Sequence, residues 1–98
     1  MSMEWPFADP PNTAVFTTIG VVDRQEWIYL VTHDAEDGAW QFHHARDSQP
    51  RVAEALVVAL HRILKIEPAV AELADLPLGW QAWRESKDAE WIRAPHSE

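Results

Sequence analysis

Three runs of β-forming residues, separated by polar turns, constrain the fold of this chain more than any other feature. The runs are Ala14–Val22, Trp27–His33 and Ala39–His43, and each is rich in β-branched or aromatic side chains. The polar stretches Asp23–Glu26 and Asp34–Gly38 separate them, and the second ends in a glycine, which tight turns favour. Strands that follow one another through short turns pair antiparallel, so the pattern predicts a three-stranded meander.

The register of this meander follows from the two turns. If Val22 faces Trp27 and His33 faces Ala39, directly opposite residues lie on the same face of the sheet. Both hairpins then predict one apolar face, which consists of Val15, Thr17, Ile19, Val21, Ile28, Leu30, Thr32, Trp40 and Phe42. The opposite face is mixed and carries Phe16, Thr18, Gly20, Trp27, Tyr29, Val31, His33, Gln41 and His43.

The segment after the meander predicts a helix that covers the apolar face. Residues 50–65 place apolar side chains at helical spacing, in a stripe of Val52, Leu56, Ala59, Leu60, Ile63 and Leu64. Pro68 separates this helix from a second short helix over residues 68–75, because proline disfavours helical geometry in the residue before it. Residues 80–85 predict a fourth, edge strand. The expected fold class is α+β, an antiparallel three- to four-stranded meander sheet with one main α-helix packed on one face and a second short helix.

The length of 98 residues predicts a single domain over residues 1–98. Residues 1–13 hold three of the seven prolines and predict an extended N-terminal arm, whose Trp5 and Phe7 dock on the body. Residues 94–98 predict a frayed tail.

Charge and composition exclude several classes of protein. The formal net charge of −8 argues against nucleic-acid binding, which needs a basic surface, and it permits a basic protein partner. The chain has no cysteine, which removes disulfides, thiolate metal sites and cysteine nucleophiles. No signal peptide and no apolar run of about 20 residues is present, so the expected location is the cytoplasm, with no membrane partner.

No motif predicts catalysis, a metal or a cofactor. His43 and His44 are neighbours on a predicted strand and therefore point to opposite faces. His33 is roughly 13 Å from His43 in the predicted register, too far to share an ion. Ser48, which precedes the predicted helix, has the place of an ordinary cap. We expect no catalytic residue, metal or cofactor, and the sequence favours a protein that is not an enzyme without deciding the question.

Aromatic residues are the remaining signal for function. The chain has six tryptophans, and tryptophan and arginine are enriched where proteins bind one another. The candidate binding residues are Trp27, Tyr29, His43, Trp83 and Arg84. The structural alternative is that the C-terminal tryptophans cover the mixed face of the sheet and form a second core layer.

Three segments carry a resemblance to known sequences: WPFADPPNTAVFTT at 5–18, DGAWQFH at 37–43 and DLPLGWQAWR at 75–84. They resemble a family of short, uncharacterised bacterial proteins. More distantly, the strand pair, acidic turn and Gly-x-Trp-x-Phe pattern is similar to a domain of unknown function that is grouped with immunity proteins of bacterial polymorphic toxin systems. The resemblance implies a protein-binding role and assigns no catalytic residue.

Three functions therefore stay open at this point. The first is a non-catalytic, immunity-like module that binds a basic protein partner. The second is a small-ligand-binding or enzymatic domain that uses the aromatic face around Trp27, Tyr29 and His43, which requires that face to be open and concave. The third is a homodimeric housekeeping protein, and the sequence decides neither between monomer and homodimer nor among these functions.

Overall fold

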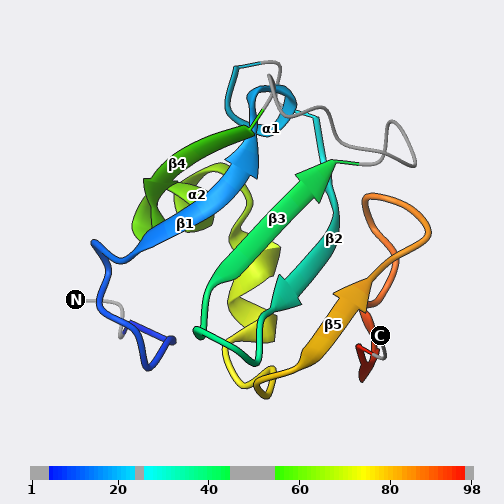
Figure 1. The fold of residues 1–98 in the computed structure, drawn as a ribbon. Helices are drawn as coiled ribbons and strands as arrows, with labels where there is room; N and C mark the ends of the chain where they lie inside the picture. Colours follow the sequence, from blue (N-terminus) through cyan, green and yellow to red (C-terminus); the bar gives the residue numbers. More distant parts are fainter. Residues whose placement is uncertain (1–4, 24–25, 45–54, 97–98) are drawn as a thin grey trace.

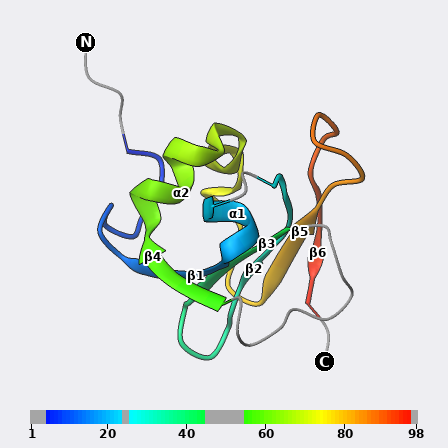
Figure 2. The same cartoon turned by 90° about the horizontal axis from the view of Figure 1, so that it is seen from above.

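The computed structural model describes residues 5–23, 26–44 and 55–96. In this part of the chain the strands form one six-stranded sheet in the order β4-β1-β3-β2-β5-β6 (Figure 1, and Figure 2 for β6). The elements are β1 (Ala14–Thr18), α1 (Ile19–Asp23), β2 (Ile28–His33), β3 (Trp40–His44), β4 (Ala55–Ala59), α2 (Leu60–Ile66), the 3-10 helix η2 (Pro68–Leu73), β5 (Trp80–Trp83) and β6 (Ile92–Pro95). The fold is α+β with a mixed sheet, because β1 and β3 run parallel while the other neighbouring strands run antiparallel.

The predicted three- to four-stranded antiparallel meander is therefore wrong. The first predicted strand stops at Thr18, and its second half forms α1 instead. The Thr18 hydroxyl accepts a hydrogen bond from the backbone N–H of Val21 at 3.2 Å, which is the bond of a helix N-cap. Because a helical turn replaces the first hairpin, β1 cannot fold back on β2 and pairs in parallel with β3.

The predicted main helix over residues 50–65 is also corrected. Residues 55–59 form β4, an edge strand that pairs antiparallel with β1, and the helix begins only at Leu60. Residues 50–54 lie outside the described part of the chain. The short apolar run over residues 55–59 also fits the two-residue repeat of a strand, since Leu56 and Val58 are half-buried while Ala55 and Val57 are exposed.

The second hairpin exists, but its register differs by one residue from the prediction. His33 pairs with Trp40 rather than Ala39, across a turn in which the Gly38 N–H donates to the Asp34 carbonyl at 2.9 Å. Gly38 has φ of 74°, a left-handed conformation that favours glycine. The shift moves Val31 and His33 to the inner face and Leu30 to the outer face, whereas an irregularity between Ile28 and Leu30 keeps Ile28 buried.

The helices lie on one side of the sheet and bury its inner face (Figure 2). The buried core there comprises Phe7, Val15, Val21, Ile28, Val31, Trp40, Phe42, Leu60, Ile63, Val70, Leu73, Leu76 and Ala82. Val70, Leu73 and Leu76, in and just after η2, are buried in this core.

The N-terminal arm packs on this core as its aromatic residues predict. Phe7 is buried and meets Trp40 edge to face, with ring centroids 5.1 Å apart. Asp9 fixes the arm, because its carboxylate accepts a hydrogen bond from the Trp40 indole N–H at 2.8 Å and its carbonyl accepts one from Trp5.

The C-terminal strands widen the sheet instead of covering it. β5 pairs with β2 on one side and β6 on the other, so residues 80–83 form an internal strand and not the predicted edge. Trp80 and Trp91 pack against the buried core of the helix side. The alternative in which these tryptophans cover the second face is therefore wrong for the described residues.

Candidate functional site

The face of the sheet opposite α2 and η2 is uncovered by any helix of the described chain, and we call it the open face (Figure 1). Cross-strand pairing assigns its residues, because paired residues share a face. One row consists of Val57, Phe16, Gln41, Thr32 and Gln81, and the next consists of His43, Leu30, Trp83 and Ile92.

Large apolar side chains on this face are exposed. Val57 is 60% exposed, Phe16 45% and Ile92 43%. Tyr29, at the irregular end of β2, is 38% exposed. These residues come from four different strands, and folding of the described residues leaves all of them accessible to a partner.

A shallow hollow lies between β2 and β5 on this face. Its volume is about 290 Å³, and Tyr29, Leu30, Gln81 and Trp83 line it. The volume is at the lower limit of small-molecule sites, which occupy roughly 300–1,000 Å³ and enclose their ligand. An open depression of this size suits one side chain of a protein partner better than an enclosed small molecule.

His43 is the titratable group at the edge of the open face. Burial lowers the pKa of His43, the neighbouring His44 lowers it further, and Asp34 opposes the shift. Its Nε2 lies 3.1 Å from the Gln41 amide oxygen, whose amide nitrogen donates to the Asp34 carboxylate at 2.8 Å. The Nδ1 atom of His43 is buried and has no hydrogen-bond partner, so neither ring nitrogen is exposed for a new hydrogen bond in this conformation.

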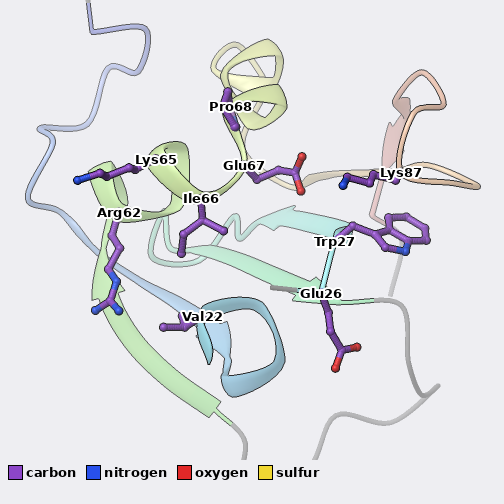
Figure 3. A pocket seen from close by; sticks show the side chains of 9 residues that line it. All are labelled: Val22, Glu26, Trp27, Arg62, Lys65, Ile66, Glu67, Pro68 and Lys87. Carbon is purple, nitrogen blue, oxygen red and sulfur yellow. The ribbon is translucent and has the colours of Figure 1, made fainter. Parts of the chain in front are cut away.

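A second hollow lies on the opposite side of the molecule and has a volume of about 730 Å³. It is lined by Val22, Glu26, Trp27, Arg62, Lys65, Ile66, Glu67, Pro68 and Lys87. Figure 3 shows Glu67 and Lys87 pointing toward one another across it, while Arg62 and Lys65 point away from both. The cationic groups therefore do not converge on one point, and the arrangement does not form an anion site.

Arg84 directly follows β5 and contacts two residues that line this second hollow, Trp27 and Glu67. It is 2% exposed, and its guanidinium stacks over Trp91 at 4.3 Å and Trp27 at 5.6 Å from the ring centroids. Its Nε–H donates to the Ile28 carbonyl at 2.9 Å, and its Nη2 forms an ion pair with Glu67 at 3.3 Å. A side chain this enclosed positions neighbouring strands and is not offered to a partner.

The structure divides the five predicted binding residues between these two places. Tyr29, His43 and Trp83 share the open face, while Arg84 is buried and Trp27 contacts both the Arg84 guanidinium and, edge to face, the Tyr29 ring. Phe16 belonged to the predicted mixed face but not to the predicted site. The sequence pattern does not identify Val57 or Ile92, because it predicts a helix at Val57 and no strand at Ile92.

The histidines point to separate partners. His44 Nδ1 lies 2.7 Å from the Thr18 hydroxyl, and the His33 ring stacks on Trp40 with 3.8 Å between centroids. Among the described residues no group of three or more histidine, aspartate and glutamate side chains could hold a metal ion. Within the same residues no helix is long and apolar enough to cross a membrane.

In a comparison with known proteins, no family model, no curated protein and no solved structure matches this chain.

Proposed function

We propose that this chain is a non-catalytic protein-binding module and that the open face is its binding surface. The observation that carries the proposal is the exposure of Phe16, Tyr29, Val57 and Ile92 on one face of a single sheet. Gln41 and His43 of β3 divide this face into two apolar patches, one on β4 and β1 and the other on β2, β5 and β6. Exposed apolar patches are typical of sites that bind another protein. Trp83 and Leu30 between them supply the aromatic and aliphatic centre that such interfaces favour.

The partner that fits this surface is a basic protein with an apolar patch. The net charge of −8 attracts a cationic partner over long range and steers its approach. Acidic side chains occur in the segments that follow β2 and β5. Asp34, Glu36 and Asp37 lie between β2 and β3, and Glu85, Asp88 and Glu90 lie between β5 and β6. An immunity-like protein that binds a basic toxin domain in the cytoplasm is the most specific form of the proposal, and its support is this charge together with the sequence resemblance.

The experiment compares partner retention by three immobilised chains in a native extract at low ionic strength. The double variant Tyr29→Thr/Ile92→Thr removes two apolar groups from the open face at positions where threonine keeps strand propensity. Leu78→Thr is the matched control, because Leu78 is 57% exposed in the turn before β5.

We expect a basic protein that the wild-type chain and Leu78→Thr both retain and that the double variant loses. Raising the salt concentration is expected to release it, because screening weakens attraction between opposite charges. Equal retention by all three chains, or recovery of no protein by any of them, would contradict the proposal.

A further inference from the structure

Among the described residues, nothing gives the outer edge of β4 the usual protection of a strand edge. Strand edges in monomeric proteins are blunted by charged residues, prolines or short length. β6, at the other end of the sheet, has four residues and includes Arg93 and Pro95. β4 has the sequence Ala-Leu-Val-Val-Ala, with no charged residue and no proline, and no strand of the described residues pairs with its outer side.

The pairing of β4 with β1 determines which backbone groups this edge offers. The Leu60 N–H donates to the Thr13 carbonyl at 2.8 Å, next to the paired residues Ala14 and Ala59. Hydrogen-bonded and non-hydrogen-bonded pairs alternate along an antiparallel ladder. The backbone N–H and C=O groups of alternate residues therefore point away from β1, and these residues are Ala55, Val57 and Ala59.

We infer that a second copy of this chain pairs with this edge, antiparallel and about a two-fold axis at Val57. In this register Val57 faces the partner's Val57, and Ala55 faces the partner's Ala59. All three outward-pointing residues are then hydrogen-bonded, which gives about six backbone hydrogen bonds, two from each facing pair. The strand is complementary to itself in this register, which is the requirement of a two-fold interface.

The side chains support a second copy in preference to the basic partner of the open face. Val57 and Phe16 face each other across β4 and β1, and both are largely exposed. The two-fold pairing places Val57 against the partner's Val57, so Phe16 and Val57 of the two copies form one short apolar row across the seam. β4 contributes no acidic group that a basic partner would recognise, whereas an uncharged strand brings no like charges together at the seam.

Dimerisation through β4 is independent of the proposed partner and responds oppositely to salt. Each copy has a net charge of −8, so two copies repel one another at long range and salt is expected to strengthen the dimer. Binding of a basic partner is expected to weaken under the same change. The direction of the salt effect therefore separates the two interactions.

Sedimentation velocity over a range of protein concentrations tests this inference with three variants. Val57→Lys introduces a charge at the two-fold axis, and Val57→Pro removes an outward N–H that β1 does not use. Leu78→Lys is the control, since its exposure of 57% is close to the 60% of Val57.

We expect the wild-type chain and Leu78→Lys to dimerise as concentration rises, and both Val57 variants to need about tenfold or more protein to do so. Circular dichroism verifies that the variants are folded. A wild-type chain that stays monomeric at millimolar concentration, or Val57 variants that dimerise like the wild type, would overturn the inference. Neither result bears on Tyr29 and Ile92, so failure of the dimer is distinguishable from failure of the partner-binding proposal.

Discussion

Both faces of this sheet carry aromatic residues, but helices of the described chain cover only the inner face. On the inner face Trp40 and Phe42 are at most 2% exposed and pack against helices and the N-terminal arm. On the open face Phe16 and Tyr29 are 45% and 38% exposed. The comparison teaches that aromatic content does not distinguish core from surface, because the difference comes from which face the helices cover.

The largest expected effect is on the inner face, at Trp40. Replacing Trp40 with alanine removes its stacking on His33, its contact with Phe7 and its hydrogen bond to Asp9. Large-to-small changes at such sites lower the free energy of unfolding by about 3–5 kcal/mol. Urea unfolding followed by circular dichroism measures the loss, and Trp40→Phe gives a milder form if the alanine variant does not fold. If Trp40→Ala lowers the free energy of unfolding by less than about 1 kcal/mol, the inner face does not stabilise the fold more than the open face does.

The next effect is at Gly20, on the helix side. A Cβ at Gly20 would lie 2.7 Å from the His44 ring, whose side chain is 7% exposed. Gly20→Ala is therefore expected to displace that ring and to lower the free energy of unfolding by about 1–3 kcal/mol. His44→Ala provides the matched background, in which Gly20→Ala should cost clearly less. An equal cost in both backgrounds would show that the ring is not the obstacle.

A smaller effect is expected at Phe16 on the open face. Phe16→Thr keeps a β-forming residue at an exposed position and should change the free energy of unfolding by about 0.5–1 kcal/mol at most. The same urea titration as for Trp40→Ala makes the two values comparable. A loss as large as that of Trp40→Ala would mean that the open face stabilises the fold as the inner face does.

The smallest effect is the pH dependence that His43 contributes. Because burial lowers the pKa of His43 in the folded chain below the ordinary 6.5, the unfolded chain takes up the proton more readily. The contribution to stability is therefore full above about pH 6.5 and falls as the pH decreases toward the folded pKa. His43→Asn should flatten the pH dependence of the unfolding midpoint below pH 6.5. An unchanged slope in that variant would contradict the assignment.

Sequence patterns predicted the inner positions of β1 and β3 correctly but not the topology. Val15, Thr17, Trp40 and Phe42 are inward as their alternation predicts. The alternation of a strand is local, whereas the partner of a strand depends on the intervening chain. Thr18 ends β1 and caps α1, and a threonine suits both places, so the residue type does not predict where the strand stops.

The candidate site was predictable only in part, because the face on which a side chain lies depends on the register of its strand. Tyr29 remains on the open face although the register shifts by one residue, because the irregularity between Ile28 and Leu30 reverses the shift at that end of β2. Arg84 illustrates the opposite limit. Nothing in its local sequence distinguishes an exposed anchor from a buried cation, and its burial follows from Trp27 and Trp91, which directly precede β2 and β6.

The most direct test of the division between the faces measures partner retention and unfolding free energy on the same Tyr29→Thr/Ile92→Thr chain. Retention of a basic partner is expected to be lost, while the free energy of unfolding stays within about 1 kcal/mol of the wild type. A double variant that loses several kcal/mol of stability, or one that retains the partner as the wild type does, would contradict the assignment of the open face to binding.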